Sequence, residues 1–154
     1  MIGLGNPLMG DDAFGPRVIE RLRRETPDSL RYADLADAHT DLLTQIARFP
    51  AYRRVVLVDA VIYPQECAGS AGNIVVLDEE TIQAWPETSP SVHQLSPLLA
   101  IKLFRCLNPH AATQILLLGL CTNGAELGSG MGAKSGALSE ETVAAGVEKA
   151  RELL

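Results

Sequence analysis

The amino-acid sequence predicts one domain, residues 1–154, with a three-layer α/β/α fold around a mostly parallel twisted sheet. Strand-like and helix-like segments alternate along the chain with short connections, which is typical of folds whose helices cover both faces of a parallel sheet. The runs at 54–59 and 114–118 have apolar interiors, as strands buried on both faces do. A chain of 154 residues is long enough to bury a core of this kind.

The first part of the chain supplies two strands and two helices before the first central strand. Residues 2–4 form a short apolar strand, and an amphipathic helix follows from Pro16, with Val18, Ile19 and Leu22 on one face. Residues 30–35 alternate between apolar and polar side chains like a half-buried strand. Residues 40–49 have the apolar spacing of a helix.

The second part continues the alternation. Residues 73–77 are expected to form a strand, and Ser96 is followed by a proline at the start of a helix, where the missing N–H costs nothing. Ser139 and the glutamates after it predict the cap and first turn of the last helix. The glycine-rich stretch 123–138 has no periodic pattern and is interpreted as a connecting loop.

Charge and cysteine content exclude several classes of function. The formal net charge is −6 and the basic residues form no large patch, so binding to nucleic acid or to an anionic membrane surface is not expected. No apolar run reaches membrane-spanning length, and no signal peptide precedes the first strand. Cys67, Cys106 and Cys121 lack the spacing of a disulfide framework or a structural zinc site, which favours a cytoplasmic location.

Polar residues follow three of the predicted segments at the edge of the sheet where ligands bind in such folds. Asp11 and Asp12 come after the first strand, Asp59 ends the first central strand, and His93 lies in the loop before the Ser96 helix. Each alone has a structural explanation, such as a helix cap or a solvated loop. Together, two carboxylates and an imidazole form a mixed set with open positions that suits nickel, zinc or iron better than calcium.

Two familiar active-site types do not fit the sequence. A dinucleotide site would need a third glycine where Leu8 stands, and the adjacent carboxylates would repel a pyrophosphate, so no nucleotide cofactor is expected. No G-x-S-x-G motif follows any strand, which argues against a serine hydrolase of the nucleophile-elbow type.

Several motifs resemble those of the hydrogenase maturation endopeptidases, which trim a C-terminal extension from the large subunit of [NiFe]-hydrogenases. These motifs are GLGNPLMGDDAFGPRV at the N-terminus, VVLVDAV, SVHQLSP, and LLLGLCTNGAELG followed by GALSEE. They occur in the family's order and span nearly the whole chain. Each motif alone is modestly specific, and the set together is strong.

The resemblance implies a function and a set of site residues. Asp12, Asp59 and His93 match the family's nickel-binding residues and are the expected metal-binding and catalytic residues, while Asn6, His39 and Thr40 are expected to contact the substrate. The nickel would be supplied by the immature large subunit, which is the expected partner. The resemblance thus implies a nickel-dependent endopeptidase in which the metal or a carboxylate activates water or polarises the scissile carbonyl.

The chain also departs from the family pattern. Many members have a glutamate where Asp12 stands, and many have a D-G-G-T-like stretch where this chain has DAHT at 37–40. His39 and the HQLSP form of the histidine loop resemble the branch that serves soluble, cofactor-reducing hydrogenases. The apolar residues that usually precede the family's GxGN are absent, which is the pattern of a misplaced start codon.

Two other functions remain open at this point. A non-catalytic nickel-sensing or docking module for hydrogenase assembly would use the same three ligands. A peptidyl-tRNA hydrolase-like esterase shares the GLGNP beginning, but that similarity stops after Pro7 and the chain is acidic, which disfavours tRNA binding.

Overall fold

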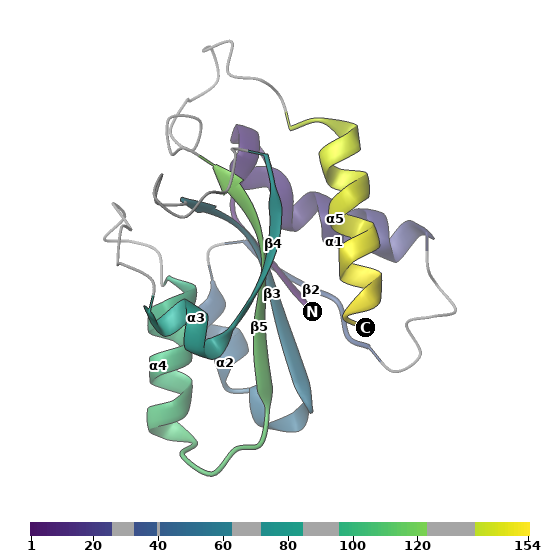
Figure 1. The fold of residues 1–154 in the computed structure, drawn as a ribbon. Helices are drawn as coiled ribbons and strands as arrows, with labels where there is room; N and C mark the ends of the chain where they lie inside the picture. Colours follow the sequence, from purple (N-terminus) through teal and green to yellow (C-terminus); the bar gives the residue numbers. More distant parts are fainter. Residues whose placement is uncertain (26–32, 40, 63–71, 85–95, 123–137) are drawn as a thin grey trace.

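A five-stranded sheet in the order β2-β1-β3-β5-β4 runs through the middle of the molecule (Figure 1). This computed structural model describes residues 1–25, 33–39, 41–62, 72–84, 96–122 and 138–154. Four strands are parallel, and the edge strand β4 is antiparallel to β5. The strands are β1 (Ile2–Leu4), β2 (Ala36–His39), β3 (Arg54–Ile62), β4 (Ile74–Asp78) and β5 (Gln114–Thr122).

Helices cover both faces of this sheet, which confirms the predicted α/β class and its mostly parallel sheet. Figure 1 shows α1 (Phe14–Glu25) and α5 (Glu140–Glu152) together on one side. On the other side lie α2 (Leu42–Ile46), α3 (Glu79–Ala84) and α4 (Pro97–Leu107). Two short 3-10 helices, η1 (Gly10–Ala13) and η3 (Phe49–Ala51), complete the described elements. Of the helices in these described ranges, none is long and apolar enough to cross a membrane.

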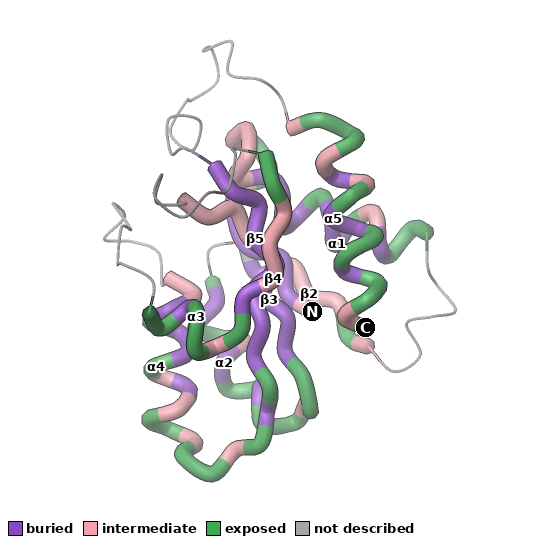
Figure 2. The backbone as a smooth tube through the Cα atoms, in the orientation of Figure 1, coloured by how far each residue is buried: buried purple, intermediate pink, exposed green. Residues whose placement is uncertain are grey.

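Each face of the sheet has its own apolar core, as the alternation of side chains along β3 shows. Val55 and Leu57 pack in the cluster on the α2 and α4 side, whereas Val56 and Val58 pack in the cluster under α1 and α5. All four side chains are buried, so the middle strands are purple in Figure 2. Because successive residues of a strand point to opposite faces, this pattern also fixes the side on which the next residue, Asp59, lies.

The helix starts agree closely with the sequence. The Ser96 and Ser139 hydroxyl oxygens accept hydrogen bonds from the N–H groups of Leu99 and Thr142, at 3.2 and 3.0 Å, and so cap α4 and α5 as predicted.

Several element boundaries differ from the prediction. The second strand is β2 at 36–39 rather than 30–35, because its backbone pairs with β1 from Ala36 onward and the described residues 33–35 precede that pairing. The helix expected over 40–49 is the shorter α2, and α3 was not predicted. Both central strands are longer than expected, and this difference shapes the candidate site.

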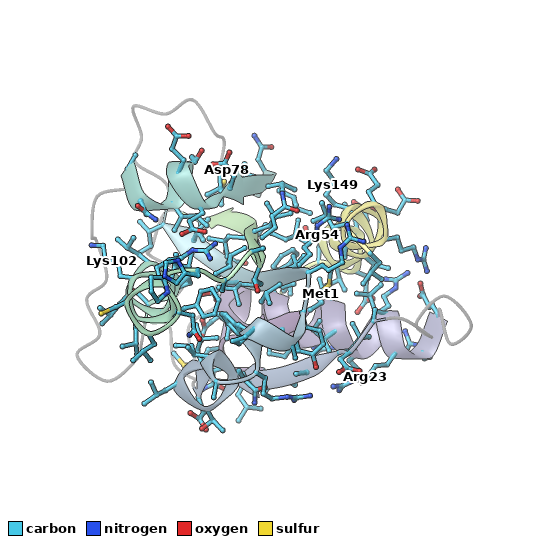
Figure 3. All side chains as sticks on the ribbon, turned by 90° about the horizontal axis from the view of Figure 1, so that it is seen from below. Met1, Arg23, Arg54, Asp78, Lys102 and Lys149 are labelled. Atoms are coloured by element: carbon cyan, nitrogen blue, oxygen red, sulfur yellow. The ribbon has the colours of Figure 1, made fainter. Side chains whose placement is uncertain are left out.

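The end of the sheet opposite that site is closed by polar contacts. Figure 3 looks at the molecule from below and shows Arg54, at the start of β3, close to α5. Its guanidinium donates to the Gln114 side chain at 2.8 Å and to the Leu153 carbonyl at 3.0 Å. These contacts tie two neighbouring strands to the end of the last helix.

Candidate active site

The candidate site lies where β1 ends and its neighbour β3 continues. Pairing of β3 with β5 runs from Arg54↔Gln114 to Ile62↔Thr122, but pairing of β1 with β3 stops at Gly3↔Val58. The sequence predicted that Asp59 is the last residue of its strand, and this is wrong, because β3 runs on to Ile62. Asp59 is instead the first residue of β3 beyond the pairing with β1. The strand continues because Ala60–Ile62 still pair with β5. The 3-10 helix η1, which carries Asp12, contacts β3.

The loop after β1 turns back on itself and brings Asp12 to its own beginning. Gly5 has a φ of +106°, a backbone angle that residues other than glycine rarely adopt. The Asn6 side-chain oxygen accepts a hydrogen bond from the Leu8 N–H at 3.0 Å, and the Met9 N–H donates to the Asn6 carbonyl at 3.1 Å. The Asn6 N–H donates to Asp12 Oδ2 at 2.8 Å. The carboxylate of Asp12 is thus part of the turn and does not cap a helix.

Asp59 is held by its own strand. Its Oδ1 atom accepts a hydrogen bond from the Ala60 N–H at 2.9 Å. The Gln114 N–H donates to the Arg53 carbonyl, so odd-numbered residues of β3 direct their backbone groups to β5 and Ala60 directs its own toward β1. The side chain of Asp59 projects to the face covered by α2 and α4, like Val55 and Leu57.

The two carboxylates lie close enough to influence each other. Burial and, to a smaller extent, the charge of Asp12 together raise the pKa of Asp59 to about 8, against the opposing effect of the Ala60 N–H. Burial also raises the pKa of Asp12, opposed by its bond to the Asn6 N–H. No ion pair in the described ranges neutralises either carboxylate. Two partly buried carboxylates without a cation fit the oxygen donors of a metal site.

Among the described residues, hydrogen bonds to the two carboxylates end on one oxygen of each, Asp12 Oδ2 and Asp59 Oδ1. No described hydrogen bond ends on Asp12 Oδ1 or Asp59 Oδ2, the oxygens that could bind a ligand or accept a proton. No group of three histidine, cysteine or acidic side chains that could hold a metal is present among the described residues.

The remaining predicted site residues are only partly visible. His93 and Thr40 lie outside the described residues, as does nearly all of the loop 123–138. The backbone of His39 is described: it ends β2 and pairs with Leu4, the last residue of β1. His39 therefore lies at the same edge of the sheet as Asp59. The described structure brings together Asp12, Asp59 and Asn6.

Two glycines that sequence reasoning did not assign hold the site together. A Cβ atom on Gly15 would lie 2.2 Å from the Leu4 carbonyl oxygen and 2.3 Å from that of Val58, so only glycine allows α1 to begin against β1 and β3. A Cβ atom on Gly5 would lie 2.0 Å from the Asp12 carbonyl oxygen. In the sequence, each glycine stands beside the end of a strand or the start of a helix. That position does not show which backbone atoms pack against the glycine in the fold.

The fold is the one found in hydrogenase maturation endopeptidases, and structural comparison confirms the resemblance seen in the sequence. The chain is similar to [NiFe] hydrogenase maturation protease HybD from Thermococcus kodakarensis, with 25% identity, a TM-score of 0.66, and coverage of 99% of this chain and 93% of that one. It is also similar to hydrogenase maturating endopeptidase HybD from E. coli, with 23% identity, a TM-score of 0.70, and coverage of 99% and 86%.

Sequence comparison gives a further similar protein, over a shorter part of the chain. The chain is 27% identical over 116 residues to coenzyme F420 hydrogenase subunit delta of Methanothermobacter thermautotrophicus, which covers 69% of this chain and 72% of that protein. No family model matches the sequence.

Proposed function

We propose that this protein is an endopeptidase of hydrogenase maturation that removes the C-terminal extension of a nickel-loaded [NiFe]-hydrogenase large-subunit precursor. The observation that carries the proposal is the pair formed by Asp12 and Asp59, two uncompensated carboxylates at the end of β1, in a fold shared with hydrogenase maturation proteases. The match with Thermococcus HybD covers nearly the full length of both chains, which supports a common type of activity.

The metal in this proposal belongs to the substrate. Asp12 and Asp59 would each offer one free oxygen to nickel carried by the precursor, and His93 would add an imidazole, as the family resemblance implies. Nickel bound there would act as a Lewis acid toward the scissile carbonyl. Because the carboxylates lack a cation of their own, a precursor without nickel would bring nothing to relieve their repulsion, and recognition would depend on the metal.

The protein's own groups would orient the reaction. Hydrolysis adds water to the scissile carbonyl, breaks the C–N bond and transfers a proton to the leaving amine. A carboxylate oxygen, on Asp12 or on Asp59, would accept a proton from the attacking water. The hydrogen bonds from the Asn6 and Ala60 N–H groups would keep both carboxylates oriented while the peptide is held against them.

The loop that carries Asp12 also offers an apolar contact to the precursor. Leu8 is 75% exposed, so it does not fold back onto the core. It stands four residues before Asp12 and would meet the large subunit when the peptide reaches the carboxylates. Exposed apolar side chains beside a site commonly serve as contact residues.

The relative from Methanothermobacter bears on the choice of substrate and of activity. Its name describes a subunit of a coenzyme F420 hydrogenase, which supports assignment to the branch that serves cofactor-reducing hydrogenases. A protein named as a hydrogenase subunit also favours the second candidate function, a non-catalytic module that docks on the hydrogenase and senses nickel. Cleavage separates the two functions.

The test is intact-mass analysis of a candidate large-subunit precursor, with and without nickel, after incubation with this protein. We expect a C-terminal peptide to be lost only from the nickel-loaded precursor, and Asp12→Ala and His93→Ala to abolish the loss. Complex formation without any loss of mass, under all conditions, would contradict the endopeptidase function and support the docking module.

A further inference from the structure

The contacts of Asn6 point to a role different from the substrate contact expected from the sequence. We propose that Asn6 is a positioning residue: its side chain fixes the turn that presents Asp12, and its backbone holds the Asp12 carboxylate. The inference rests on the proposed function only in that Asp12 is taken as a metal ligand.

The side-chain oxygen and the backbone N–H of Asn6 both form hydrogen bonds within its own loop. The side-chain oxygen accepts the Leu8 N–H at 3.0 Å, which makes a turn that mimics a backbone turn. The backbone N–H donates to Asp12 Oδ2 at 2.8 Å. A residue engaged in this way has its acceptor oxygen and its main-chain donor committed before any substrate arrives.

The side chain and the Asp12 bond are coupled through the backbone. The Asn6 carbonyl accepts the Met9 N–H at 3.1 Å, and the Met9 carbonyl accepts the Asp12 N–H at 2.9 Å. These bonds link the turn closed by the Asn6 side chain to the residue that carries the carboxylate. If the side-chain oxygen is removed, the Leu8 N–H loses its partner and the chain of bonds that orients Asp12 loses its first member.

These contacts of Asn6 would affect metal binding because they orient the Asp12 carboxylate. With Asp12 Oδ2 held by the Asn6 N–H, the free Oδ1 atom is the oxygen available for a cation. Groups that orient a metal ligand typically change metal affinity by about 10- to 100-fold when they are removed. Truncation of Asn6 should therefore weaken metal binding although Asn6 does not touch the metal.

The experiment measures Ni²⁺ binding to the isolated protein by isothermal titration calorimetry, for the wild type, Asn6→Ala and Asn6→Ser. Serine keeps a neutral side-chain oxygen that can accept the Leu8 N–H, whereas alanine has none. We expect about a 10-fold weaker Kd for Asn6→Ala and partial rescue by Asn6→Ser. Asn73→Ala serves as the matched control, since Asn73 is exposed and its one described hydrogen bond is made by its backbone carbonyl.

A second readout separates positioning from substrate contact. In steady-state cleavage of the nickel-loaded precursor, a positioning role lowers kcat/KM for Asn6→Ala in parallel with the loss of Ni²⁺ affinity, whereas a substrate contact lowers kcat/KM and leaves Ni²⁺ affinity unchanged. Unchanged Ni²⁺ affinity in Asn6→Ala, or a wild type that binds no Ni²⁺, would overturn the inference. If wild type and variant differ in Ni²⁺ affinity but neither cleaves, the positioning role stands and the endopeptidase function fails.

Discussion

Two regions of this molecule contain partly buried charges, which have a partner of opposite charge in one region and a neighbour of the same charge in the other. Between α3 and α4, the Arg105 guanidinium donates to both carboxylate oxygens of Glu79, at 2.8 and 2.6 Å, and to the carbonyl oxygens of Ala111 and Thr113. At the end of β1, Asp12 and Asp59 face each other with only backbone N–H groups as described partners. In the first region the charges are paired, whereas in the second no described residue supplies a cation.

The difference indicates which charges stabilise the fold and which are kept for another purpose. A paired charge such as Arg105 lowers the free energy of the folded state only with its partner in place. The Asp12–Asp59 pair raises it, because burial and mutual repulsion disfavour ionisation. A destabilising pair at the edge of the sheet where ligands bind is what a site for a cation-bearing substrate requires.

The largest expected effect is on catalysis. Asp59→Asn keeps the size of the side chain but removes its charge, and we expect cleavage of the nickel-loaded precursor to fall at least about 10³-fold. Intact-mass time courses at matched enzyme concentration measure the rate. Activity within about threefold of the wild type would show that the second region is not catalytic.

The next effect is loss of stability in the first region. Arg105→Ala removes the cation beside Glu79, which keeps only the hydrogen bond from the Gln83 side chain among its described side-chain contacts, and takes the donor from two carbonyl groups. The free energy of unfolding should therefore fall by about 2–3 kcal/mol. Urea unfolding at pH 7 measures the change. The exposed ion pair of Lys149 with Glu152 is the control, because Lys149→Ala should change stability by less than about 0.5 kcal/mol. If both variants lose the same free energy of unfolding, the partly buried Arg105 pair is no more stabilising than the exposed Lys149 pair.

The same substitution that stops catalysis should stabilise the protein. At pH 8, Asp59→Asn removes the cost of burying a carboxyl whose pKa is raised from 3.8 to about 8, and the free energy of unfolding should rise by up to about 5 kcal/mol. This sign is opposite to that of Arg105→Ala. A decrease of similar size would mean that the Asp59 charge is compensated in the folded protein.

The pH dependence of stability follows from the same group. The pKa of Asp59 is raised from 3.8 to about 8 on folding, so between these values the unfolded chain has lost a proton that the folded chain keeps. Stability should therefore decrease as pH rises from about 4 to 8, and the decrease should be smaller in Asp59→Asn. Thermal unfolding of both proteins at pH 5 and pH 8 measures this; parallel changes in Tm would contradict the assignment to Asp59.

The smallest expected effect concerns the loop beside the pair. Leu8→Ser should leave the Tm within about 2 °C, because Leu8 is 75% exposed, and should raise KM for the precursor severalfold. Leu107→Ser is the control, since Leu107 is 64% exposed but lies at the end of α4. The same KM for both variants would show that Leu8 does not contact the precursor.

Much of the fold could be predicted from local patterns, because buried strands and capped helices leave clear signals. The apolar runs around Val56 and Leu117, and the caps at Ser96 and Ser139, gave the central strands and two helix starts. The second strand was misplaced because its position depends on pairing with β1 rather than on its own pattern. Local sequence contains no information on which segment an edge strand will pair with.

The candidate site could be predicted in its residue types but not in its connections. Asp12 and Asp59 stood out as acidic residues near strand ends, and the structure shows that they influence each other. The hydrogen bonds that the Asn6 and Ala60 N–H groups donate to these carboxylates lie where β1 stops at Leu4 while β3 continues. That mismatch in strand length is a tertiary property. The parts played by His93 and Thr40 remain predictions.

The central claim is that Asp59 costs stability and supplies activity, and one set of measurements on Asp59→Asn tests it most directly. Urea unfolding at pH 8 and cleavage of the nickel-loaded precursor are measured on the same preparation. The account predicts a protein that is more stable than the wild type and does not cleave. A variant that is less stable, or one that still cleaves at the wild-type rate, would contradict it.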